Sequence, residues 1–88
     1  MHAKRHLICG IHITDRLQHA VKVQELLTQY GKFIKTRLGL HEVGEGNDSP
    51  NGLLLLEFLD DEAAFTKFTG DIAKVEGIEV QKMIFEHP

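Results

Sequence analysis

Alternation of apolar and polar residues predicts most of the strands in this sequence. Every second residue is apolar between residues 5 and 13, and residues 33–43 alternate in the same way. A period of two is typical of a strand, because successive side chains point to opposite faces. Residues 53–58 form a short apolar run bounded by turn-forming residues, and residues 78–85 alternate again. We therefore predict strands near 5–13, 32–43, 52–59 and 78–86.

Two stretches between these strands carry their apolar residues at helical spacing. The first stripe covers residues 20–30 and the second covers residues 65–75, and both have the same three-four-three spacing. Residues spaced in this way lie on one face of a helix, so both stretches predict amphipathic helices, near 15–30 and 60–76. A glycine follows each stripe, as is common at the end of a helix.

The predicted element order is β-α-β-β-α-β, and 88 residues are enough for one domain, 1–88. Two βαβ half-units with right-handed crossovers form a four-stranded antiparallel sheet with both helices on one face. This is the α+β, ferredoxin-like arrangement. Its first and third strands are expected to be central.

The sheet face that the helices leave uncovered is rich in apolar residues. The third strand is apolar on both sides, whereas the free face of an antiparallel sheet is normally polar. A large exposed apolar patch indicates a binding surface. The residues that we assign to it are Ile8, Leu53, Leu55, Met83 and Phe85. We expect a homo-oligomer, a dimer or a tetramer, joined through these faces; a ligand cleft or a different covering partner is the alternative.

Polar residues beside this patch are candidates for a ligand site. The alternation in 33–43 predicts Arg37 and His41 on the uncovered face, near His12 of the first strand. A guanidinium can hold an anion, and neutral imidazoles are common metal ligands. We therefore select His12, Arg37 and His41 for a small ligand or a metal, and assign no particular metal or cofactor. Solvated histidines and a charged edge strand that discourages strand addition are the alternatives.

The single cysteine and the charge balance exclude several classes of protein. Cys9 has no partner for an internal disulfide, and its strand position predicts burial on the helix side. Ten basic and thirteen acidic residues give a net charge of −3, which provides no basic surface for nucleic acid. No apolar run approaches the ~18 residues of a membrane span. We expect a cytoplasmic protein that binds neither nucleic acid nor membranes directly.

No spacing in the sequence matches a catalytic signature. The nucleophile elbow, the zinc-protease helix, paired cysteines and paired carboxylates are all missing from the sequence. We therefore expect no enzymatic activity. The enzyme alternative is a dimeric α+β barrel of the small monooxygenase type, with an apolar pocket between sheet and helices. A pure protein-interaction module is the third possibility.

Several segments together resemble a known family of small regulators. They are Thr14-Asp15-Arg16 after the first strand, Ile34-x-x-Arg37-Leu38-Gly39 in the second, and Val75-Glu76-Gly77-Ile78-Glu79-Val80 at the last. In these the chain resembles the stand-alone regulators of iron-only hydrogenase systems, which are related to ACT-like domains and to the C-terminal domain of the nickel-responsive regulator. The resemblance implies a regulatory, ligand-sensing module that assembles through its sheets, with a role in hydrogenase or metal regulation.

The sequence departs from the nickel-responsive regulator at the metal site. That regulator has a His-x-His pair on its second strand with a cysteine soon after, whereas here His41 is followed by Glu42 and Val43. This departure argues against nickel sensing. The first predicted strand also begins within about five residues of Met1, so we expect no DNA-binding arm of the regulator's type.

Overall fold

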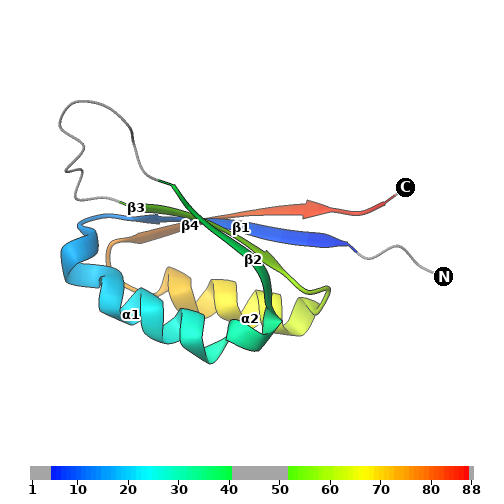
Figure 1. The fold of residues 1–88 in the computed structure, drawn as a ribbon, viewed down its shortest axis with the longest axis horizontal. Coiled ribbons are helices and arrows are strands. Elements are labelled where there is room, and N and C mark those ends of the chain that lie inside the picture. The colour runs from blue at the N-terminus through cyan, green and yellow to red at the C-terminus, as the bar shows by residue number, and fades with distance from the viewer. Residues whose placement is uncertain (1–4, 41–51, 88) are drawn as a thin grey trace.

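The computed structural model describes residues 5–40 and 52–87, which form one sheet with two helices packed against it (Figure 1). In chain order the elements are β1 (His6–Ile13), α1 (Arg16–Gln29), a 3-10 turn (Gly31–Phe33), β2 (Ile34–Leu40), β3 (Gly52–Phe58), α2 (Glu62–Ala73) and β4 (Ile78–Phe85). This order confirms the predicted α+β, ferredoxin-like βαββαβ fold. The described boundaries lie within a few residues of the predicted ones; residues 41–43 of the predicted second strand lie outside the described residues.

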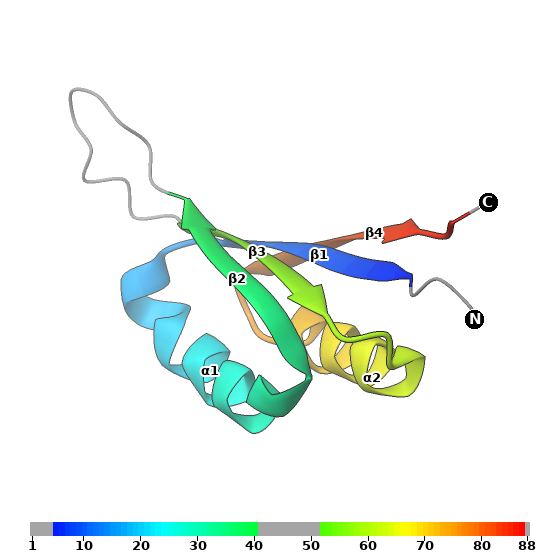
Figure 2. The same ribbon diagram turned by 45° about the vertical axis from the view of Figure 1, so that its right-hand side comes forward.

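The strands lie side by side in the order β2-β3-β1-β4, and each neighbouring pair is antiparallel. β1 and β3 are therefore the central strands, as predicted, and β2 and β4 are the edges. Figure 2 shows both helices on the same side of the sheet. We call the opposite side the open face, because no described element covers it.

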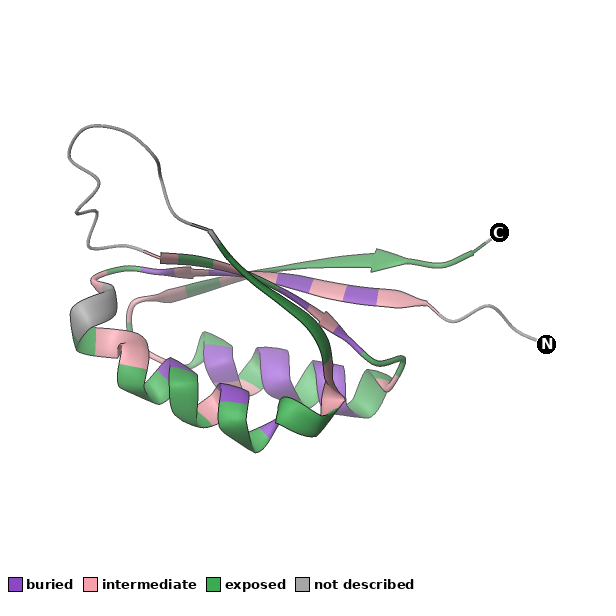
Figure 3. Cartoon of the chain, viewed as in Figure 1, coloured by how far each residue is buried: buried purple, intermediate pink, exposed green. Residues whose placement is uncertain are grey.

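The core lies between the sheet and the helices. β1 alternates strictly, with Leu7, Cys9 and Ile11 fully buried and the residues between them partly exposed. Figure 3 shows this alternation as bands along β1, together with buried residues on the inward sides of the helices. Cys9 is buried as predicted, and burial raises the pKa of its thiol to about 12. The thiol is therefore protonated at neutral pH, and Cys9 serves as a core residue rather than as a metal ligand.

The second strand contains a bulge. Ile34 pairs with Phe58, but Thr36 pairs with Glu57, so two steps along β2 correspond to one step along β3. A bulge adds one unpaired residue and therefore exchanges the faces of all residues beyond it. Over residues 36–40 of the described strand, the predicted alternation is therefore wrong.

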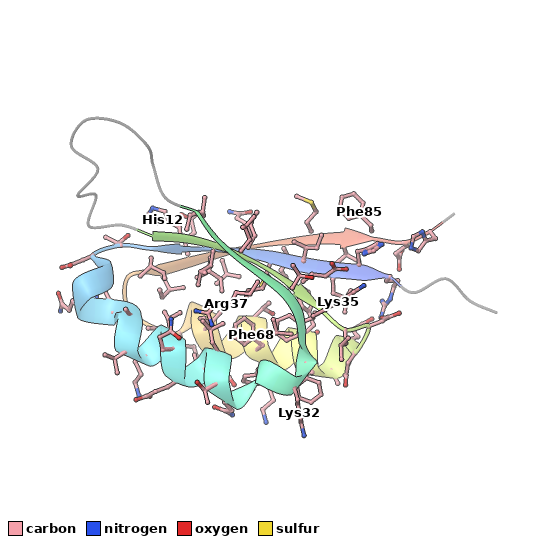
Figure 4. All side chains as sticks on the ribbon, viewed as in Figure 1. His12, Lys32, Lys35, Arg37, Phe68 and Phe85 are labelled. Carbon is pink, nitrogen blue, oxygen red and sulfur yellow. The ribbon has the colours of Figure 1, made fainter. Side chains whose placement is uncertain are left out.

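The bulge moves Arg37 and Leu38 to faces opposite to those predicted. Arg37 pairs with Leu56, which is buried on the helix side of the sheet. Figure 4 likewise shows Arg37 below the sheet, on the side of the helices. Leu38 instead pairs with Leu55 and belongs to the open face.

Polar contacts connect the sheet to the helices and the helices to each other. The Arg5 guanidinium donates to Oδ1 of Asp60 at 2.9 Å and to Oε1 of Glu62 at 2.6 Å. The start of β1 is thereby tied to the start of α2. At the end of α1, the Tyr30 hydroxyl donates to Oδ2 of Asp71 on α2 at 2.7 Å. These contacts add to the apolar core in fastening the start of α2 to β1 and α2 to the end of α1.

Candidate functional site

The open face consists of alternate residues from all four strands, and strand pairing fixes which of them are neighbours. Gly10 lies near its centre, directly opposite Leu55 on β3 and Gln81 on β4. Successive rows across the sheet are Glu79-His12-Leu53, Gln81-Gly10-Leu55-Leu38 and Met83-Ile8-Glu57. In Figure 4, His12 and Phe85 project from this side, whereas Phe68 lies on the helix side.

Large apolar side chains occupy much of the open face. The structure brings the five predicted interface residues, Ile8, Leu53, Leu55, Met83 and Phe85, onto this one face. Leu55 is 38% exposed and Met83 is 55% exposed. Leu38, 50% exposed, joins them because of the bulge, which the period-two pattern did not reveal. We call these six residues the apolar patch; their role as an interface stays a prediction.

A hollow of about 370 Å³ lies in the apolar patch, above Gly10. The missing side chain of Gly10 leaves its floor open. The surrounding apolar residues are Ile8, Leu53, Leu55 and Met83, and the polar residues along it are His12, Glu79, Gln81 and Lys82. The hollow thus combines an apolar interior with a few polar groups, which is the usual composition of a small-molecule site.

A charged cluster lies at the other end of the open face from His12. Nδ1 of His6 is 2.6 Å from Oε2 of Glu57, and Nζ of Lys35 is 3.9 Å from the same oxygen. The hydrogen bond with His6 lowers the pKa of Glu57 below its ordinary value, although burial opposes it, and the charge of Lys35 adds to the lowering. Sequence reasoning missed this cluster, because it depends on the registers of β1 and β2 against β3.

The three predicted ligand residues do not come together among the described residues. His12 lies on the open face, directly opposite Leu53 and Glu79. Arg37 lies on the helix side of β2, so its predicted grouping with His12 is wrong. His41 lies outside the described residues. The polar residues that accompany His12 at the hollow are instead those of β4, beginning with Glu79.

A metal centre has no support in the described part of the chain. Within residues 5–40 and 52–87, no group of three or more His, Cys, Asp and Glu residues is arranged to hold a metal ion. His6 is engaged with Glu57, and Cys9 is buried on the opposite side of its strand. The described open face offers apolar surface and hydrogen-bonding groups.

Aromatic rings pack closely together in the layer between sheet and helices. The Phe58 ring centroid lies 5.4 Å from that of Phe65 and 5.0 Å from that of Phe68, and Phe68 is fully buried. An enzyme of the α+β barrel type needs a substrate pocket in this layer. The close packing of these rings gives that alternative no support.

A second hollow, of about 530 Å³, lies between α1 and α2. Its lining mixes both charges: His19, Lys22, Glu25, Asp71, Lys74 and Glu76. This mixture favours no single ligand chemistry.

Among the described helices, none is long and apolar enough to cross a membrane.

The fold, rather than the sequence, connects this chain to known proteins. No protein-family model and no curated protein matches the sequence. An uncharacterized protein from Thermotoga maritima superposes with a TM-score of 0.79 at 23% identity, over 96% of this chain and 100% of that chain. A PII-like signalling protein from Thermus thermophilus gives a TM-score of 0.63 at 12% identity, over 97% of this chain and 90% of that chain.

A third similar structure contains bound nucleotides. CPII from Thiomonas intermedia K12, a nitrogen regulatory PII-like protein, was solved with ADP, AMP and acetate. It superposes with a TM-score of 0.54 at 13% identity, covering 97% of this chain and 90% of that chain. At these low identities the likeness establishes the shared fold alone.

Proposed function

We propose that this chain is a non-catalytic regulatory domain that senses a small ligand and associates with copies of itself through the open face. One observation carries the proposal: six large apolar side chains from four strands form a patch on a surface that no described element covers, and four of them, Ile8, Leu53, Leu55 and Met83, surround a hollow. A contiguous exposed apolar patch marks a binding surface. A concave apolar site with a few polar groups suits a small molecule.

A second copy of the chain is the occupant that fits the apolar patch best. Each copy buries only the helix side of its sheet, so two open faces in contact would give both sheets a second apolar layer. Burial of apolar area is worth about 25 cal/mol per Å². The charged cluster offers the cations of Lys35 and, when protonated, His6 beside the anion of Glu57. A charged side chain of either sign on a second copy can therefore find an opposite charge at this end of the face.

The similar structures support the sensing part of the proposal. The same fold occurs in PII-like proteins, one of them with bound ADP and AMP. We place the ligand site at the hollow beside His12. A link to hydrogenase or metal regulation is supported by the sequence resemblance alone.

A thermal-shift screen of nucleotides, amino acids and divalent metals tests the sensing role. A compound that binds only the folded state raises Tm by linkage. We expect at least one compound to stabilise wild type and to stabilise His12→Ala much less. His19→Ala, on α1, is the matched control and should respond like wild type. Equal stabilisation of all three proteins would move the site away from His12, and turnover of any compound would favour the enzyme alternative.

A further inference from the structure

Gly10 is a glycine that the backbone does not require. It lies within the central strand β1, where glycine weakens a strand, and among the described glycines only Gly77 has a positive φ. A Cβ built on Gly10 would lie 3.5 Å from Cδ2 of Leu55, an ordinary van der Waals distance. Alanine would therefore fit. The consequence of having glycine here is open space above the strand, and glycine in a strand often marks the close approach of a ligand.

The size of that space indicates the size of its occupant. The hollow measures about 370 Å³, whereas an engineered apolar cavity of about 150 Å³ accommodates benzene. It is therefore large enough for two fused rings. Ile8 borders the floor along β1 and Leu55 borders it on β3, so a flat ring on Gly10 would contact both.

The polar groups at one end of the hollow indicate the charge of its occupant. Glu79 lies directly opposite His12, and the Gln81 amide donates to Oε2 of Glu79 at 3.3 Å. Glu79, Gln81 and His12 all carry acceptor atoms. Lys82 also borders the hollow, but it pairs with Cys9, so its side chain leaves β4 toward the helix side; Glu79 is the charged residue whose side chain the register directs onto the open face here. A hydrogen-bond donor is favoured at this end, and a second carboxylate is disfavoured.

We propose that the hollow above Gly10 binds a small arylalkylamine, in which a short alkyl chain joins one or two aromatic rings to a cationic amine, with its rings on Gly10 and its ammonium group donating to Glu79. The inference rests on the proposed function, because a second copy on the open face would close the hollow over the ligand. Closure would remove water from the Glu79 contact and strengthen it. The amine charge would in turn compensate a carboxylate that assembly would bury.

Calorimetric titration with tryptamine and indole-3-acetate tests the ligand class, because the two probes share a ring system and differ in the sign of their charge. We expect tryptamine to bind wild type at least about ten-fold more tightly than indole-3-acetate. Glu79→Gln keeps the shape of the side chain and should lower tryptamine affinity by a similar factor. Gly10→Val fills the floor and should abolish binding. Gly70→Ala, on α2, is the control and should bind like wild type.

Three results would overturn the inference: no binding of tryptamine to wild type, equal affinity for the two probes, or unchanged tryptamine affinity in Gly10→Val. If Gly10→Val does not fold, Gly10→Ala and Glu79→Gln decide, since alanine fits the space and still raises the floor. Sedimentation of the same samples separates this inference from the proposed function. If wild type is monomeric and binds tryptamine, the ligand site is supported and the proposed self-association is wrong. If wild type is an oligomer and does not bind tryptamine, self-association is supported and the proposed ligand is wrong.

Discussion

Nδ1 of His6 lies 2.6 Å from Oε2 of Glu57, across the two central strands on the open face. The contact is diagonal, because Glu57 is directly opposite Ile8 rather than His6. Diagonal neighbours on one face of an antiparallel pair are within reach of long side chains. The hydrogen bond fixes an ionised carboxylate at one end of a face that is otherwise largely apolar. The fold tolerates the charge of Glu57 on this face because His6 is its hydrogen-bond partner.

The stability contributed by Glu57 should depend on pH. Its folded-state pKa is lowered, first by the hydrogen bond with His6. The ionised carboxylate therefore stabilises the fold above the unfolded-state pKa, and this contribution disappears as pH falls through the lowered folded value. Denaturant unfolding should show Glu57→Gln less stable than wild type at neutral pH, with a difference that shrinks below pH ~4.

The exposed residue Glu25 on α1 provides the control for that measurement. Its contact with Lys22 is long, at 3.7 Å, and solvent-exposed, so Glu25→Gln should show little difference from wild type at either pH. A Glu57→Gln deficit that stays the same from neutral to acid pH would contradict the assigned role of the carboxylate.

Two glycines should respond oppositely to alanine. Gly77 has φ 81°, and a Cβ there would lie 2.6 Å from Cδ2 of His19; Gly77→Ala should therefore cost at least about 1–2 kcal/mol. Gly70 lies in α2 with nothing within 4 Å of a built Cβ, so Gly70→Ala should stabilise by about 0.5–1 kcal/mol. Thermal and denaturant unfolding measure both. A stabilising Gly77→Ala would disprove the turn geometry.

Leu38 distinguishes the observed register of β2 from the register predicted by alternation. On the open face, Leu38→Glu should keep the far-ultraviolet circular dichroism of wild type and weaken self-association. On the helix side, the same glutamate would enter the core and unfold the protein. Arg37→Glu is the control, since Arg37 is exposed on the other side of β2 and should leave association unchanged. An unfolded Leu38→Glu would refute the bulge.

Cys9 should resist thiol reagents until the protein unfolds. It is fully buried, and burial raises its pKa to about 12, so the reactive thiolate is scarce. In buffer without denaturant, Ellman's reagent should therefore label Cys9 only as fast as the protein unfolds. In denaturant, labelling should be immediate. Immediate labelling of the native protein would contradict the buried placement.

The regular elements of this fold could be predicted from periodicity, and the irregular ones could not. Alternation on β1 identified both of its faces, including the burial of Cys9. On β2 the apolar residues at 34, 38 and 40 formed a regular series that predicted one shared face. One extra residue between Ile34 and Thr36 broke that series, and a bulge leaves no mark in hydrophobic spacing.

Contacts between strands were equally hidden from a single sequence. The pairing of His6 with Glu57 and the position of Gly10 opposite Leu55 both depend on the register of β1 against β3. The apolar composition of the open face was visible in the sequence, because residues 53–58 are apolar on both sides. The hollow and the charged cluster on this face could not be predicted, because both depend on the register between strands.

Sedimentation equilibrium tests the central claim, self-association through the open face, most directly. At micromolar concentration, wild type should have two or four times the mass of the 10.0 kDa chain. Leu55→Glu places an unpartnered charge in the apolar patch and should sediment as a monomer. Val21→Glu, at a position 68% exposed on α1, should match wild type. A wild type that is monomeric at micromolar concentration, or a Leu55→Glu variant that keeps the wild-type mass, would contradict the claim. The apolar patch would then be a binding surface for a different partner.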